Sequence, residues 1–170
     1  MFRSHRLAAA LVLAPVLACS GAASGAPAAG QTVGGIRCER TESGVFHIHQ
    51  HLAIYDRGKP VPIPADVGRP LLGGCLYWLH THTPDGIIHI ESPTVRTFRL
   101  GEFFDLWGER LDATHLGPVK FRKGALRAYL GGRPYTGDPR KIELTEHADI
   151  VLEAGPPYKK PAPFTAWNGL

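Results

Sequence analysis

Hydrophobic and polar residues alternate between Gly44 and Tyr55, and three of the polar positions hold histidine, in the run GVFHIHQHLAIY. Because successive side chains of a β-strand point to opposite faces, this alternation predicts a strand over Val45–Tyr55 with two different sides. We expect one side to be buried and the other to present a row of imidazoles. The first side carries Phe46, Ile48, Gln50, Leu52 and Ile54, and the second carries Val45, His47, His49, His51, Ala53 and Tyr55.

Shorter apolar runs separated by turn residues predict further strands. The turn residues DRGKP are followed by VPIPADVG, which is typical of a short, proline-marked strand at a sheet edge. Two more strands, Cys75–Thr83 and Ile87–Ser92, are expected on either side of the turn signal TPDG.

A single main helix is predicted in TFRLGEFFDLWGERL, where apolar residues recur at helical spacing and Gly108 can end the helix. Strands are then expected within 119–130, at the two-glycine hairpin YLGGRPY and over 149–153. These elements predict a β-rich α+β fold in a single domain over 38–155. Their order is that of a β-grasp fold with a β-hairpin inserted at about residues 71–98.

The turn between the two middle strands decides which of their histidines share a face. With a four-residue loop over 83–86, His80 lies opposite His89 and the polar residues separate from the apolar ones. A three-residue loop would mix them. Since burial of one face fixes the register, we expect the four-residue loop. The side chains then grouped on one side are His80, His82, His89 and Glu91.

Six histidines therefore fall in two compact stretches. Opposed residues of a sheet have Cβ atoms about 4.5 to 5.5 Å apart, so imidazoles from two adjacent strands can reach one ion. Neutral imidazole is the commonest metal ligand, and clustered imidazoles would repel one another on protonation. We predict a metal site formed by His47, His49, His51, His80, His82 and His89.

The residue types around these histidines favour Cu(II) or Zn(II), and the sequence leaves both open. Imidazole suits Zn²⁺, Cu²⁺, Ni²⁺ and Fe²⁺. A Cu(I) carrier would use methionine, and the one methionine is Met1. Few carboxylates lie near the cluster, which disfavours calcium or magnesium. The predicted function is binding, storage, sensing or delivery of a transition metal.

Two other functions stay open. Three of the histidines could hold a catalytic ion whose bound water has its pKa lowered to about 7, with Glu91 or Asp85 as the base. Alternatively, the histidines could form a buried network without an ion, in a structural or interaction module. His115 and His147 lie outside the two stretches and are expected at the surface. The hydrogen-bonding partners of such a network would be Tyr77, Thr81 and Thr83.

The N-terminus is typical of an export signal. Residues 1–18 contain a short basic region and an apolar run shorter than the about 20 residues that span a bilayer. The ending VLAC at Cys19 is typical of a lipoprotein signal, in which this cysteine is lipidated, while ordinary cleavage near Ala23 or Ala26 stays open. Residues 19–37 are then a flexible tether. Either cleavage predicts an extracytoplasmic protein, in the periplasm or at the cell surface, that meets the membrane only through a lipid anchor.

Two cysteines remain in the predicted domain, Cys38 and Cys75. In an exported chain such a pair favours a disulfide, here closing a loop of about 37 residues and stabilising by roughly 3 to 4 kcal/mol. Thiolate ligation of a metal is the alternative, although the spacing differs from that of a zinc knuckle. The proline-rich tail over 156–170 is expected to be extended, with Phe164 or Trp167 docking on the domain.

Charge gives no indication of a nucleic-acid partner. The formal charge of +4 falls to +2 once Arg3 and Arg6 leave with the signal, and the chain has no long basic run. The sequence indicates no protein partner.

Three motifs together resemble a family of bacterial exported or lipoprotein-type domains that are rich in histidine. They are HIHQHLAIYDRGKPVPIPADVG, CLYWLHTHTPDGIIHIESP and FRLGEFFDLWG, and the resemblance spans about residues 44–154. It implies a secreted or lipid-anchored setting and supplies little chemistry.

Overall fold

The computed structural model describes residues 25, 27, 30–42, 44–70, 74–159 and 161–170. The predicted signal and the lipidation site Cys19 lie outside the described residues. No helix within the described ranges is long and apolar enough to cross a membrane.

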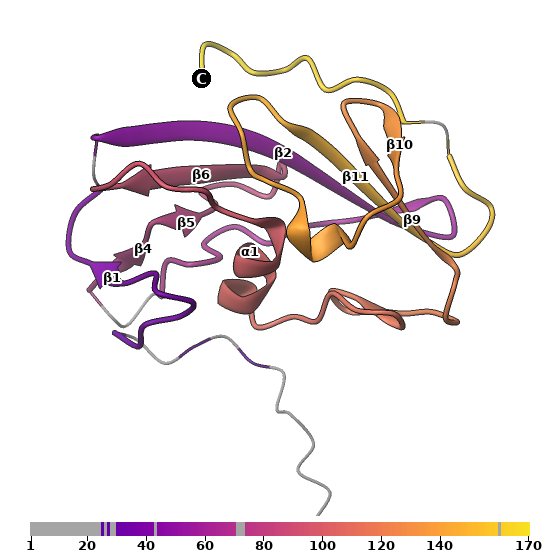
Figure 1. Ribbon diagram of the computed structural model, residues 1–170, viewed down its shortest axis with the longest axis horizontal. Coiled ribbons are helices and arrows are strands. Elements are labelled where there is room, and N and C mark those ends of the chain that lie inside the picture. Colours follow the sequence, from indigo (N-terminus) through magenta and orange to yellow (C-terminus); the bar gives the residue numbers. More distant parts are fainter. Residues whose placement is uncertain (1–24, 26, 28–29, 43, 71–73, 160) are drawn as a thin grey trace, which may run out of the picture.

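A seven-stranded sheet forms the body of the domain, and α1 (Leu100–Trp107) packs on one of its faces (Figure 1). The strand order is β10-β9-β11-β2-β6-β5, and β3 pairs beside β2. The predicted β-rich α+β fold is therefore confirmed. The strands are β2 (Phe46–Asp56), β3 (Lys59–Val61), β5 (Leu79–His80), β6 (Ile87–Ser92), β9 (Leu126–Leu130), β10 (Arg133–Tyr135) and β11 (Asp149–Ala154).

The centre of the sheet is a parallel pair, β2 and β11, with α1 between them in the chain. On one side of the pair lies β9, and on the other side β2 is shared by two neighbours. The first half of β2 pairs with β6 and its second half with β3. This arrangement agrees with a β-grasp order into which the β5–β6 hairpin is inserted beside the histidine-bearing half of β2.

The face of the sheet toward α1 forms the core. Leu52 and Ile54 of β2 are buried together with Phe103 and Phe104 of the helix, as the alternation along β2 predicts. The helix begins where the Arg99 N–H donates to the Glu102 carboxylate at 2.7 Å, and it ends at Gly108 in the left-handed conformation, φ 75°. It is shorter than the amphipathic stretch that predicts it.

The strand predicted over Cys75–Thr83 is divided in two, which corrects the sequence-based expectation. Its first part, β4 (Leu76–Tyr77), pairs with β1 (Cys38–Glu39) in a separate small sheet, and only β5 joins the main sheet. The predicted disulfide between Cys38 and Cys75 is present at this junction. The bridge and the pairing with β1 hold the first part of the segment away from β6.

Two other predicted strands also differ in extent. Residues 62–68 of the predicted edge strand form a loop whose backbone bonds to residues 77–81, for example Thr81 N–H to the Val67 carbonyl at 3.0 Å. This loop covers the outer edge of β5, which would otherwise be exposed. The stretch 119–130 contains two strands, β8 (Val119–Lys120) and β9, as expected. The strand β7 (His115–Leu116), which pairs with β8, precedes the predicted stretch. A short 3-10 helix, Pro139–Lys141, precedes β11.

The C-terminal segment crosses the face of the sheet opposite α1, as the yellow trace in Figure 1 shows. Both aromatic residues predicted to dock do so on histidines. The Phe164 ring stacks on His51 at 3.7 Å between centroids, and the Trp167 ring stacks on His147 at 4.3 Å.

Candidate metal centre

Three histidines form a row across three neighbouring strands. His49 of β2 lies directly opposite His89 of β6, and His89 lies directly opposite His80 of β5. The predicted register of the hairpin, with His80 opposite His89, is therefore confirmed. Since opposed residues share a face, the three rings lie on the side of the sheet away from the helix.

Two groups of side chains in this region could hold a metal ion. Within each group, one ligand atom from every residue lies within 4.8 Å of the others. The two groups share His89 alone. The first group is His80, His82, His89 and Glu91, and the second is His47, His49 and His89.

The fully buried His80 is held in the form that binds metal. Its Nδ1 lies 2.9 Å from the Tyr77 carbonyl oxygen, which can only accept, so Nδ1 donates a hydrogen and Nε2 carries the free lone pair. This Nε2 lies 3.2 Å from Nε2 of His82. Metal–nitrogen bonds of about 2.0 to 2.1 Å in a tetrahedral site place neighbouring ligand atoms about 3.3 Å apart. The spacing of this pair therefore fits two ligands of one ion.

Three buried atoms of the cluster have no hydrogen-bond partner among the described residues. They are Nε2 of His49, Nδ1 of His89 and Oε2 of Glu91. Leaving a buried polar group unpaired costs about 1 to 3 kcal/mol, so native proteins rarely do so. Several such atoms gathered in one place point to a ligand that completes their bonding.

Burial keeps the central imidazoles neutral. It lowers the pKa of His80 to about 4, helped by the neighbouring His82 and opposed by the hydrogen bond to Tyr77. The pKa of His89 is lowered to about 3, first by burial and then by the surrounding histidines. The pKa of His49 is lowered as well, first by burial and then by His47. At neutral pH these rings therefore have free lone pairs, as metal ligands need.

Glu91 is the carboxylate of the cluster. Its Oε1 lies 3.2 Å from Nε2 of His47, and its side chain is almost completely buried. Burial raises its pKa, as does the nearby Glu42 carboxylate, while His47 opposes them. Asp85, the other residue considered as a base, instead accepts hydrogen bonds from the Ile87 N–H and the Thr83 hydroxyl within the turn.

His51, the sixth predicted ligand, lies apart from both groups. Its Nδ1 is 2.9 Å from Oδ1 of Asp149, and its ring is covered by Phe164. The parallel pairing of β2 with β11 places Asp149 directly opposite His51. The structure therefore brings five of the six predicted histidines together and gives the sixth its own partners.

The two histidines expected at the surface also have partners within the fold. The exposed ring of His147 lies 3.0 Å from Glu146 and contacts the C-terminal segment, with Nε2 at 2.9 Å from the Leu170 carbonyl. His115 is more enclosed than predicted, because its ring belongs to a network with Arg110, Asp112 and Thr114.

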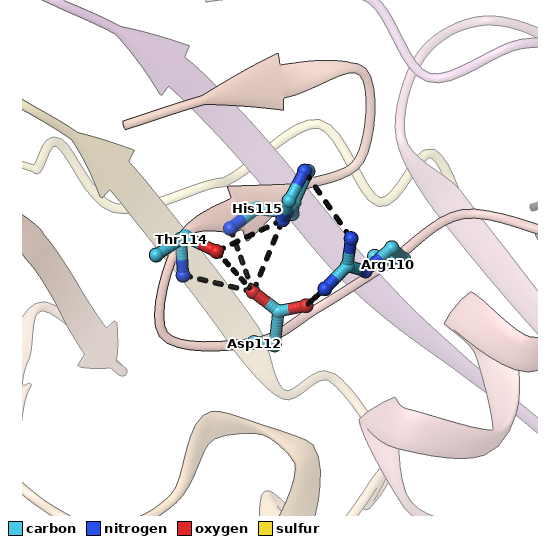
Figure 2. Close-up of polar contacts among 4 residues, drawn as sticks. All are labelled: Arg110, Asp112, Thr114 and His115. Atoms are coloured by element: carbon cyan, nitrogen blue, oxygen red, sulfur yellow. Dashed lines mark hydrogen bonds and ion pairs between the residues drawn. The ribbon is translucent and has the colours of Figure 1, made fainter. Parts of the chain in front are cut away.

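Figure 2 shows that this second network centres on the Asp112 carboxylate. Burial alone would raise the pKa of Asp112, but hydrogen bonds from Thr114 and His115 and the charge of Arg110 hold it well below its usual range. Because each polar group here has a partner, the network orders the β7–β8 hairpin and offers no free ligand set.

The metal-capable cluster is open on one side. The side chains of His47 and His82 are 46% and 34% exposed, whereas His80 is completely enclosed. Glu42 lies 4.0 Å from His82 at this open side. Glu42 belongs to no histidine motif, so the sequence does not indicate it. Tyr77 is a partner of the histidines as expected, through its backbone carbonyl. The hydroxyls of Thr81 and Thr83 instead donate to the Pro64 carbonyl and to the Asp85 carboxylate.

Comparisons of this chain with family models, with curated proteins and with solved structures found no match. The resemblance to an exported histidine-rich family stays a prediction, and the functional interpretation rests on the geometry of the cluster.

Proposed function

We propose that this protein is an extracytoplasmic transition-metal-binding domain that holds Cu(II) or Zn(II) through the imidazoles of β2, β5 and β6. The observation that carries the proposal is the convergence of neutral imidazoles around an already oriented His80, because buried nitrogens of His49 and His89 lack partners among the described residues. A metal ion would accept the lone pairs of these nitrogens. Packing against apolar side chains could not supply that bond.

The ligand types support copper or zinc over other ions. Each group offers imidazole nitrogens, and one adds a carboxylate. Among the first-row divalent metals such a site binds Cu²⁺ most tightly, and imidazole is also a suitable ligand for Zn²⁺. The cysteines Cys38 and Cys75 are joined to each other, so they offer no thiolate. The open side at His47 and His82 gives the ion a path to and from solvent, as storage or delivery requires.

The setting that we propose is the cell envelope. The disulfide fits an oxidising compartment. The signal-like residues 1–18, the lipidation motif at Cys19 and the resemblance to exported histidine-rich domains support periplasmic or surface anchoring through lipid.

Metal binding is tested on the mature domain purified without a histidine tag. Elemental analysis and calorimetric titration with Cu²⁺ and Zn²⁺ should show binding at micromolar or lower dissociation constants. The His80→Gln/His89→Gln variant should lose it, while His115→Gln, which alters a histidine of the separate network, should retain it. Absence of binding in the wild-type domain would refute the proposal.

A metal-dependent enzyme is the second candidate, because the exposed side of the cluster leaves room for an exchangeable water. In this role the buried carboxylate of Glu91 would accept a proton beside the ion. Nuclear relaxation of solvent water by the Cu²⁺ form separates the two functions: an exchanging inner water favours catalysis, and a closed coordination sphere favours binding.

A further inference from the structure

The ring of His89 belongs to both ligand groups. Its strand lies between the other two, and imidazoles flank it on either side. The rings of His49 and His82 stand edge-on to it at 4.7 and 4.4 Å between centroids. An imidazole has two ring nitrogens on different edges, so one ring can bind two ions once it has lost its N–H proton.

The ligand groups are arranged as two sets and not as one. Ligand atoms of His80, His82, His89 and Glu91 come within 4.8 Å of one another, and those of His47, His49 and His89 do so separately. Each set has three or four ligands, which is the number that a zinc or copper ion takes from protein. One ion would leave part of the cluster unused.

Glu91 also meets both sets. It is a member of the first, yet its Oε1 lies 3.2 Å from Nε2 of His47 in the second. Its other oxygen is buried without a partner in the part of the chain that the structure describes. The Glu91 carboxylate therefore lies within reach of both sets.

Three carboxylates lie at the cluster, more than the sequence indicates, and they offset the charge of a second cation. Besides Glu91, Glu42 lies 4.0 Å from His82 of the first set. At the other end, Glu146 accepts a hydrogen bond from the backbone N–H of His49 at 3.2 Å. The three carboxylates thus lie beside His82, His47 and His49 of the cluster.

We propose that the centre holds two transition-metal ions, one in each ligand set, with the His89 ring as the bridge between them. The inference rests on the proposed metal binding and deepens it. Binding of the second ion displaces the remaining ring proton of His89 to solvent, so that each ring nitrogen donates a lone pair to one ion.

The test uses the mature, untagged protein and Cu²⁺ as the probe. Titration should saturate at two ions per chain. Bridged Cu²⁺ ions couple magnetically, so the integrated electron paramagnetic resonance signal at two equivalents should fall below the signal at one equivalent. Filling one set with Zn²⁺ before Cu²⁺ is added should restore an uncoupled signal.

Variants separate the sets. His47→Gln/His49→Gln should leave one ion in the first set and His80→Gln/His82→Gln one ion in the second, both without coupling. The matched control His51→Gln, on the same strand but outside the sets, should keep both ions and the coupling. Saturation at one ion, or two ions with a full uncoupled signal, would overturn the bridge while leaving metal binding intact. Absence of any bound ion in the wild type would refute metal binding itself. The wild-type titration and spin count decide the matter even if a variant does not fold.

Discussion

Two positions on the histidine-bearing face of β2, His49 and His51, carry the same side chain in different surroundings. Toward the start of the strand, His49 is buried against other imidazoles and its Nε2 has no partner among the described residues. Toward the middle, His51 meets a carboxylate at 2.9 Å and an aromatic ring at 3.7 Å. A metal ion would complete the bonding of the His49 ring, whereas the fold itself already provides partners for the His51 ring. Histidine count alone therefore does not identify ligands; the partners of each ring nitrogen do.

The largest expected effect on metal affinity comes from removing two ligands of the histidine cluster. The His80→Gln/His89→Gln variant should weaken Cu²⁺ or Zn²⁺ binding by more than about 100-fold, since loss of even an outer hydrogen-bond partner of a ligand costs about 10- to 100-fold. Calorimetric titration measures it. His51→Gln changes a histidine of β2 whose ring already has partners within the fold, and it should leave the affinity within about twofold. Equal losses of affinity in the two variants would contradict the distinction between the cluster histidines and His51.

Metal bound to the histidine cluster should stabilise the fold. At a free ion concentration of 100 times the dissociation constant, the free energy of unfolding should rise by about 2.7 kcal/mol. Urea denaturation of the wild type and of His51→Gln should show this rise, and the His80→Gln/His89→Gln variant should not. Stabilisation that survives in the latter variant would place the ion elsewhere.

Acid should weaken the metal-free protein through the buried rings. Folding lowers the pKa of His80 to about 4 and that of His89 to about 3, from an unfolded value near 6.5. Below pH 6.5 the unfolded chain therefore binds more protons than the folded one, and stability falls by up to about 1.4 kcal/mol per pH unit for each group. We expect a loss of about 2 kcal/mol between pH 6.5 and 5.5.

Denaturation of the chelator-treated protein over this pH range measures the loss. The His80→Gln/His89→Gln variant serves as the control, because its stability should depend less on pH over the same interval. A wild-type curve as flat as that of the variant would contradict the burial of neutral imidazoles.

The smallest expected effect is a loss of stability at His51, whose ring has its partners within the fold. Phe164→Ala removes the ring that covers His51 and should lower the free energy of unfolding by about 1 kcal/mol, the order of an aromatic stacking contact. Metal affinity should not change. A large loss of metal binding would mean that the C-terminal segment takes part in the centre.

The parts of the site that could be predicted from the sequence are those set by local pattern. Alternation along 45–55 predicts the two faces of β2, and the TPDG turn with separated polarity predicts His80 opposite His89. Gly86 allows this turn, because its φ is +83° and a Cβ there would collide with the Leu52 carbonyl oxygen. These features depend on residues that are close together in the chain.

The parts that could not be predicted depend on contacts between distant segments. Asp149 pairs with His51 across 98 positions of sequence because β11 lies parallel to β2, and no motif marks that pairing. The strand predicted over 75–83 breaks because β1 pairs with its first part. The same break brings the Tyr77 carbonyl to His80, so Tyr77 orients this ligand through a backbone atom, a role that its side chain does not indicate.

Anomalous X-ray scattering from crystals of the Cu²⁺-loaded protein, recorded on both sides of the copper absorption edge, locates the ion directly. The expected result is edge-dependent density among the rings of His80, His82 and His89, within bonding distance of their nitrogens. Copper density confined to His51, His147 or the outer surface, with none in the cluster, would contradict the assignment of these imidazoles as metal ligands.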